Sequence, residues 1–226
     1  MRSRLTLTII FMLTSGSVLA QDVTTEKGKL SYAVGWDIGA DIKRRSTDFD
    51  VESLITAIRD VVADNEPKVG NQEMRTLLTV LQEKVRAEQV EQFRVLSEKN
   101  QADSEAFLEA NKTKTGIKVL PSGIQYLIMI PGTGAHPGLE SKVMVHYRGS
   151  KLDGREFDSS FIRGTPDEFT VNAVLKGWQE VLPLMKAGAT WRIFVPPEMA
   201  FGERGNPPVG PNEALTFDLE LVEILP

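Results

Sequence analysis

The hydrophobic positions of the N-terminal third repeat with the period of a helix. Between residues 26 and 63 they form two series, Leu30, Val34, Ile38 and Ile42, then Leu54, Ile55, Ile58, Val61 and Val62. Asp50 directly precedes the second series, where its carboxylate can cap a helix. We therefore expect two helices. Because such a pair buries too little surface to be stable alone, and Tyr32 and Trp36 lie off the main stripe, we expect this region to contact another chain.

Residues 71–115 contain neither glycine nor proline, which predicts one long helix. Its apolar positions lie near one face, and opposite charges are spaced three residues apart, as in Glu83 with Arg86 and Glu91 with Arg94. At ~1.5 Å per residue the helix extends on the order of 60 Å, so it either connects two domains or is broken near its middle. The polar segment EKNQADSE at 98–105 predicts an exposed stalk. The alternative, a helical hairpin, has no turn residues to support it.

After Gly116 the period changes from helical to alternating. Four segments have the pattern of strands: GIQYLIMI, KVMVHYRGS, TWRIFV and LTFDLELVEI. In the last of these, Leu215, Phe217, Leu219 and Leu221 alternate with polar residues. One short helix is expected at GWQEVLPLM. The pattern predicts an antiparallel sheet curled over one helix, an α+β domain of about 110 residues.

The first 20 residues have the features of a signal peptide. Arg2 and Arg4 precede the apolar run LTLTIIFML. The small residues Val18 and Ala20 lie at the positions that a signal peptidase favours, and we expect cleavage after Ala20. A membrane anchor is the alternative, but the apolar run is shorter than the ~20 residues that span a bilayer. Cleavage would change the formal net charge from -5 to -7.

Composition excludes several partners and chemistries. The 226-residue chain has 26 basic and 31 acidic residues and no basic run. It therefore lacks the sequence pattern of a nucleic-acid-binding surface. It has no cysteine, which excludes disulfides, thiolate metal sites and a cysteine-linked lipid. Stability must then come from packing or oligomerisation. Together with the signal peptide, this composition favours a bacterial envelope protein.

Catalytic motifs with a nucleophile, a metal or a phosphate loop are absent from the sequence. It contains no G-x-S-x-G, H-E-x-x-H or P-loop pattern, and we expect no cofactor. Only two histidines are available. His146 faces away from Val143 and Val145 on its strand, so we interpret it as a hydrogen-bonded structural residue. His136 lies in the loop GTGAHPG and is expected to be exposed.

An aromatic set with one acid is the remaining candidate site. It comprises Tyr147, Phe157, Phe169, Trp178, Phe201 and Phe217, accompanied by Asp158. Aromatic residues at strand spacing usually form a core, and that interpretation stays open. However, several of these residues lie in the loop-like segments REFDSSFIRGTPDEF and MAFGERG, which favours a working surface.

These segments resemble a known family over residues 116–226. The stretches VHYRGSKLDGREFDSS, TPDEFTVNAVLKGW, LMKAGATWRIFVPPEMAFGERG and NEALTFDLEL are similar to the FK506-binding class of peptidyl-prolyl isomerases. The N-terminal LSYAVGWDIGADIK resembles the dimerisation module of the exported macrophage-infectivity-potentiator branch. The resemblance implies a signal peptide at 1–20, a dimerisation domain at 21–70, a connecting helix at 71–115 and an isomerase domain at 116–226.

The resemblance also assigns roles to residues. It implies that Tyr147, Phe157, Asp158, Trp178 and Phe217 are catalytic and that Phe169, Val174, Leu175 and Phe201 bind substrate. Trp178 would form the floor, Asp158 would lie beside the Tyr147 hydroxyl, and the Leu175 N–H would hold a substrate carbonyl. Most members have a tyrosine where this chain has Phe201.

Three functional hypotheses follow. The first is a periplasmic, V-shaped homodimeric prolyl isomerase that also holds unfolded, proline-containing clients and binds FK506-like macrolides. The second is a peptide-binding chaperone with weak isomerase activity, motivated by the hydroxyl that Phe201 lacks. The third is a virulence-type factor associated with the outer membrane or secreted, which nothing in the sequence decides.

Overall fold

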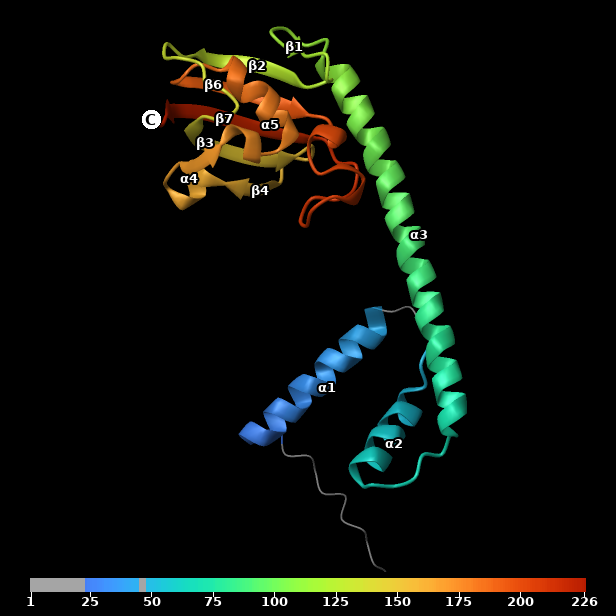
Figure 1. Ribbon diagram of the computed structural model, residues 1–226. Helices are drawn as coiled ribbons and strands as arrows, with labels where there is room; N and C mark the ends of the chain where they lie inside the picture. Colours follow the sequence, from blue (N-terminus) through green and yellow to red (C-terminus); the bar gives the residue numbers. More distant parts are fainter. Residues whose placement is uncertain (1–22, 45–47) are drawn as a thin grey trace, which may run out of the picture. The chain divides into compact units, whose positions relative to one another are not determined.

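The computed structural model of the chain describes residues 23–44 and 48–226. The signal peptide predicted at 1–20 lies outside these residues. The chain divides into two compact units, residues 1–81 and 82–226, which are described separately below. Figure 1 shows the helical and sheet-containing parts along the chain.

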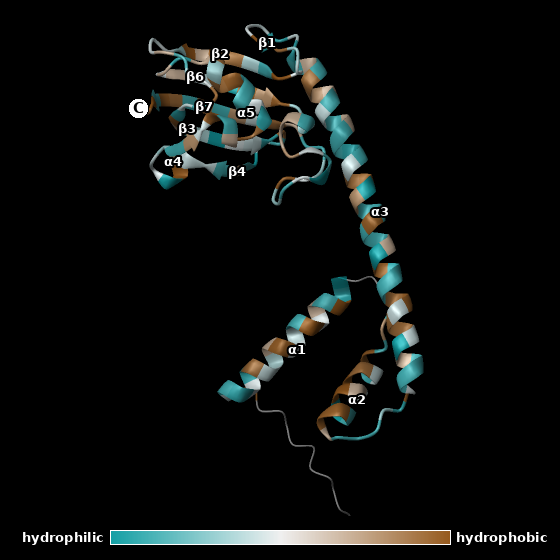
Figure 2. Cartoon of the chain, in the orientation of Figure 1, coloured by the Kyte–Doolittle hydropathy of each residue, from teal (hydrophilic) through white to brown (hydrophobic). Residues whose placement is uncertain are grey.

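The N-terminal unit is helical, as the hydrophobic pattern predicts. Helix α1 is Glu26–Arg44 and α2 is Val51–Val62, and the Asp50 carboxylate caps α2 by accepting from the N–H groups of Glu52 and Ser53. Neither helix contains a buried residue. Figure 2 shows the hydrophobic positions along both helices. Tyr32 and Trp36 remain 59% and 69% exposed, so this unit leaves its apolar side chains uncovered in the single chain.

Helix α3, Asn71–Asn111, is continuous over 41 residues, which excludes the hairpin and the break. Its second half belongs to the C-terminal unit, where Asn100, Ser104 and Asn111 are buried. The expected exposed stalk at 98–105 is therefore wrong at Asn100 and Ser104. Polarity was a misleading guide there because these side chains hydrogen-bond to backbone groups of the sheet domain. No helix in the described part of the chain is both long and apolar enough to cross a membrane.

The C-terminal unit is a curled antiparallel sheet. Its strands are β1 Lys118–Val119, β2 Gln125–Pro131, β3 Lys142–Lys151, β4 Glu156–Ser159, β5 Asp167–Thr170, β6 Ala189–Val195 and β7 Leu215–Ile224. The order is β1-β2-β6-β7-β3-β4, with β5 also paired to β3. All pairings are antiparallel, and the four predicted strands and the α+β class are confirmed.

The prediction of a loop at residues 155–169 is wrong. It contains β4, β5 and the one-turn helix α4, Ser160–Arg163. Strands of four residues are too short for an alternating pattern to reveal them, and both form by pairing with β3. This pairing places Phe157 and Phe169 on two strands that pair with β3 at different points along its length.

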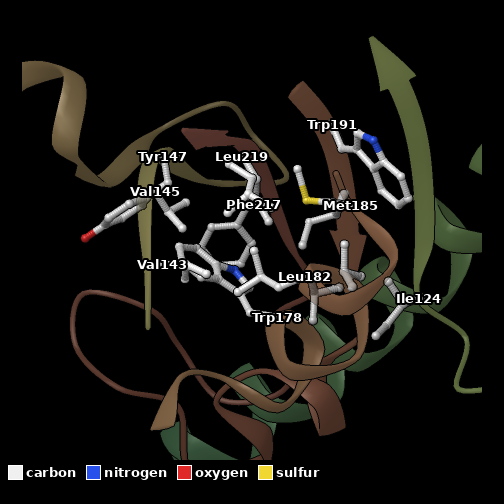
Figure 3. Packing of buried hydrophobic residues seen from close by; sticks show 14 of the residues in the cluster. Ile124, Val143, Val145, Tyr147, Trp178, Leu182, Met185, Trp191, Phe217 and Leu219 are labelled. Atoms are coloured by element: carbon white, nitrogen blue, oxygen red, sulfur yellow. The ribbon is translucent and has the colours of Figure 1, made fainter. Parts of the chain in front are cut away.

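The core lies between the sheet and α5, Lys176–Val181, which continues into the 3₁₀ turn Leu182–Leu184 (Figure 1). Figure 3 shows apolar side chains from the central strands packing against Trp178 and Leu182. A Cβ added at Gly177 would lie 2.7 Å from Val195 Cγ1, so α5 approaches β6 closely. This close packing determines how deeply Trp178 enters the domain.

Candidate active site

An aromatic cavity of about 220 Å³ opens on the C-terminal domain. Its lining consists of Tyr147, Phe157, Asp158, Phe169, Ala173, Val174, Leu175, Trp178, Phe201 and Phe217. The structure thus brings all nine predicted site residues together. Ala173 is the one lining residue that sequence reasoning missed, because a small apolar side chain has no distinguishing signal. We refer to this site as the aromatic cavity.

Trp178 lies at the centre of the ring packing. The rings of Tyr147, Phe169 and Phe217 have centroids 5.1, 5.7 and 5.3 Å from the Trp178 ring, at interplanar angles of 76°, 85° and 87°. These are edge-to-face contacts, in which ring edges meet the electron-rich faces of neighbours. Trp178 is only 4% exposed, so its ring is held on several sides.

Gly149 leaves the room for two of these rings. A Cβ at this position would lie 2.6 Å from Phe157 Cζ and 2.9 Å from Phe217 Cε1. Phe157 and Phe217 themselves make an edge-to-face contact at 5.8 Å and 86°. A side chain at 149 would therefore displace rings that line the cavity, which makes this glycine part of the site's construction.

A hydrogen-bonded triad forms the polar rim. The Tyr147 hydroxyl donates to Asp158 Oδ2 at 2.6 Å, and Arg163 donates to Asp158 Oδ1 at 2.6 Å and to the Tyr147 hydroxyl at 2.9 Å. Arg163 also pairs with Asp167 and lies over the Tyr147 ring. Sequence reasoning missed Arg163, although its place between two acids, Asp158 five residues before it and Asp167 four residues after it, offered a signal.

Comparison with known proteins agrees with this geometry. Residues 134–222 match the family described as FKBP-type peptidyl-prolyl cis-trans isomerase, and residues 27–128 match the domain amino terminal to it. The chain is 41% identical to the "Outer membrane protein MIP" of Legionella longbeachae, over 91% of this chain and 88% of that protein. It belongs to the FKBP-type peptidyl-prolyl cis-trans isomerases.

Two further relatives extend the likeness over nearly the full chain. The peptidyl-prolyl cis-trans isomerase Mip of Coxiella burnetii is 36% identical over 96% of this FKBP and 95% of the relative. The crystal structure of FkpA from Escherichia coli has a TM-score of 0.71 and 30% identity, covering 89% of this chain and 98% of that one. The chain is therefore an enzyme of this family, a prolyl isomerase.

The rim's ionisation states follow from its environment. Burial, followed by the hydrogen bond to Asp158, raises the pKa of Tyr147 to about 12, so the phenol of this FKBP stays a donor near neutral pH. Burial acts to raise the pKa of Asp158, but hydrogen bonds from Tyr147 and Arg163 outweigh it and leave the pKa below its ordinary value. Asp158 therefore carries its negative charge at neutral pH.

Ser160 holds the backbone of Tyr147 from the other side. Its buried hydroxyl accepts from the Tyr147 N–H at 2.7 Å and donates to the Tyr147 carbonyl at 3.2 Å. His146 Nδ1 lies 2.8 Å from the same hydroxyl, and the imidazole stacks on Phe161 at 4.5 Å. The structural, hydrogen-bonded role predicted for His146 is confirmed, and His136 is exposed as expected.

Phe201 closes one side of the aromatic cavity. Its ring lies edge-on to Phe157, with centroids 6.5 Å apart. It directly precedes the 3₁₀ turn Gly202–Arg204, where loop 202–214 begins. As phenylalanine it supplies apolar contact but offers no hydroxyl to a ligand.

The lining of this FKBP cavity is mainly aromatic and aliphatic, with Tyr147 and Asp158 as its polar side chains. Among the residues that the structure describes, no cluster of histidines and carboxylates could hold a metal. Two larger clefts of the C-terminal unit, of about 560 and 520 Å³, contain several charged side chains that are already paired, such as Lys151 with Glu213 and Arg192 with Asp218. Among these clefts of the C-terminal unit, the aromatic cavity combines converging rings with a polar rim, which suits an apolar ring attached to an amide.

Proposed function

We propose that the isomerase acts on X-Pro bonds within the aromatic cavity. The observation that carries this proposal is the convergence of Tyr147, Trp178 and Phe217, with the other rings, on one cavity whose rim carries a Tyr–Asp–Arg triad. Tyr147, Phe157, Asp158, Trp178 and Phe217 would act on the bond. Phe169, Val174, Leu175 and Phe201 would hold the substrate.

The physical basis is the polarity of the planar amide. Resonance produces a barrier of ~18–20 kcal/mol to rotation about the X-Pro bond and separates charge in the planar form. The twisted form has lost part of that charge separation. An apolar, largely water-free cavity therefore stabilises the twisted form relative to the planar one, and each ~1.4 kcal/mol of such preference accelerates isomerisation tenfold.

Fixed hydrogen bonds would orient the flanking chain. In this proposal the Leu175 N–H donates to a substrate carbonyl, and the Asp158 carboxylate, held by Tyr147 and Arg163, lies next to the rotating amide. Prepositioned groups of this kind need no reorganisation during rotation. No nucleophile or cofactor enters the reaction. FK506-like macrolides, which share the apolar ring and carbonyls, would compete for the same cavity.

A matched pair of tryptophan variants tests the location of the site. We expect Trp178→Phe to lower kcat/KM for a peptide with one X-Pro bond by about tenfold, because the floor contributes to the twisted state. Trp191→Phe is the control, since Trp191 is equally buried but stacks on Tyr126 and does not line the cavity. Equal effects of the two substitutions on the mature chain would contradict the proposal.

A second candidate function is peptide binding with weak isomerase activity, and Phe201 is the observation that favours it. The tyrosine hydroxyl that the family resemblance implies at this position would add one hydrogen bond, typically ~0.5–1.5 kcal/mol. We expect Phe201→Tyr to raise kcat/KM by less than about tenfold. A much larger gain would mean that the natural chain is mainly a binding protein.

We also propose where the protein works and how its segments are used. Residues 1–20 would be removed after Ala20 during export, residues 21–70 would dimerise, residues 71–115 would connect, and residues 116–226 would carry the cavity. Two observations support an envelope location: the signal-peptide pattern, and the name "Outer membrane protein MIP" of one relative. N-terminal sequencing of protein from a periplasmic fraction should begin at Gln21. An intact Met1 would refute cleavage after Ala20, and absence of the protein from that fraction would refute export to the periplasm.

In the envelope the enzyme would assist unfolded, proline-containing clients. The support is the exposed apolar surface of α1 and α2, which a second copy would cover in part. Chaperone action is separable from isomerisation because it can be measured as suppression of client aggregation. A fully active isomerase that fails to suppress aggregation would refute the chaperone part alone.

A further inference from the structure

The second half of α3 grips loop 202–214 through a row of hydrogen bonds. Asn100 Nδ2 donates to the Pro211 carbonyl at 2.8 Å, and Ser104 Oγ donates to the Asn212 carbonyl at 2.9 Å. Ser104 Oγ also accepts from the Ala214 N–H at 2.8 Å. Figure 1 shows this loop, orange to red after β6, beside the upper half of α3. The contacts lie within the C-terminal unit.

Asn212 links these contacts with α3 to the aromatic cavity. Its side chain donates to Ser97 Oγ at 2.8 Å, and its backbone N–H donates to the Gly202 carbonyl at 2.9 Å. Gly202 is bonded to Phe201, which lines the cavity. Asn212 has φ of +51°, a left-handed conformation that asparagine tolerates better than most residues. Two hydrogen bonds thus join α3 to the residue next to Phe201.

The hydrogen bonds from α3 to loop 202–214 are shielded from water. Ser104 and Asn100 are only 1% and 9% exposed, so water cannot easily replace their hydrogen bonds. Away from α3, the loop is held by its own Asn206–Val209 pairing, by the Gly210 N–H that donates to Glu213, and by the ion pair of Glu213 with Lys151 on β3. A helix is a stiffer support than such a loop. The buried contacts with α3 therefore contribute to the position of the loop and of Phe201 at its start.

We propose that Ser104 and Asn100 of the connecting helix are positioning residues for the Phe201 side of the aromatic cavity. They act through Asn212 and Gly202 and do not touch substrate. This proposal rests on the proposed substrate-binding role of Phe201. Because Phe201 would hold substrate rather than act on the bond, loosening the grip should raise KM and leave kcat nearly unchanged.

The test is a double-mutant cycle between Ser104 and Phe201 in the mature chain. We expect Ser104→Ala to raise KM for an X-Pro peptide by about threefold to tenfold, below the roughly hundredfold that a 1 Å misplacement can cost. In a Phe201→Ala background the same substitution should have no further effect on KM. Glu105→Ala is the matched control on α3, since its side chain is exposed and bonds only to Gln101.

The outcomes separate this proposal from the proposed function. If Phe201→Ala alone leaves KM unchanged, the proposed role of Phe201 fails. If Phe201→Ala raises KM but Ser104→Ala does not, or acts equally in both backgrounds, the positioning role is overturned. Should Ser104→Ala lose its native circular dichroism, Ser97→Ala replaces it in the same cycle, because it removes only the acceptor for the Asn212 side chain.

Discussion

Tyr147 illustrates how each residue of the site depends on its neighbours. Ser160 holds its backbone, Trp178 contacts its ring, and Asp158 and Arg163 hold its hydroxyl. Its ring is consequently 7% exposed, with the hydroxyl at the rim. A side chain fixed on all sides loses little entropy when substrate binds, which favours preorganised catalysis.

The charge of Asp158 should contribute to stability in a pH-dependent way. Its folded-state pKa is depressed, so the contribution is present above the unfolded value of about 3.9 and is lost as pH falls through the folded value. We expect the free energy of unfolding of wild type to exceed that of Asp158→Asn at pH 7, with the gap shrinking below about pH 4. Urea denaturation at pH 7 and pH 3 measures this gap. A gap of the same size at both values would contradict the prediction.

At the scale of elements, α3 changes its environment along its length. Its first part belongs to the N-terminal unit, whereas the face carrying Asn100, Ser104 and Asn111 is buried in the C-terminal one. Asn111 donates to the Gln125 side chain, which in turn donates to the Leu108 carbonyl. Phe107 adds an aromatic contact with Phe194 at 5.8 Å. The end of α3 thus stabilises the start of the sheet.

Two fragments, one with and one without residues 82–115 of the chain, should reveal how much α3 contributes to the stability of the sheet domain. We expect residues 82–226 to melt roughly 5–10 °C above residues 116–226, because the shorter fragment loses the contacts of Phe107 and the grip on loop 202–214. Thermal unfolding followed by circular dichroism measures the difference. Equal melting temperatures would mean that the second half of α3 contributes no stability.

At the scale of the whole molecule, the two units differ in how far they bury their apolar side chains. The C-terminal unit has a continuous buried core that includes Val145, Leu219 and Leu221, each 0% exposed. The N-terminal helices α1 and α2 have no buried residue, yet they display Leu30, Tyr32 and Trp36 at 59–69% exposure. Apolar surface of this kind is stabilised by association, which the proposed dimer provides.

A charge on this surface should dissociate the dimer and spare the enzyme. We expect Trp36→Glu to convert the mature chain to monomers at micromolar concentration in sedimentation velocity, since an unpaired charge is costly in an apolar interface. Its kcat/KM on a short peptide should equal that of wild type, while suppression of client aggregation should fall. Met129→Glu is the control, an apolar position on β2 that is also more than half exposed, at 53% against 69% for Trp36. A monomeric wild type would refute dimerisation outright.

Periodicity was enough to predict helices α1, α2, α3 and α5 and the four long strands. The order of the motifs, through their resemblance to the family, indicated the nine residues that meet in the aromatic cavity. These succeed because apolar spacing reflects which face is buried, and because the cavity residues occur in long, ordered motifs. The short strands β4 and β5 were missed, since they form only by pairing with β3. Arg163 was missed because its closeness in sequence to Asp158 and Asp167 becomes contact only in the fold. Helix α4 brings it back to Asp158, and the bend at 164–166 brings it to Asp167.

The sequence by itself determined the class of fold, the period of each main element and the aromatic composition of the site. Only the tertiary structure decided which polar residues are buried, and EKNQADSE is the clearest case. Its asparagine and serine resemble those of an exposed helix, but the free donors and acceptors of loop 202–214 satisfy them. A buried polar side chain needs a hydrogen-bond partner, and only the fold determines whether a polar side chain bonds to water or to backbone.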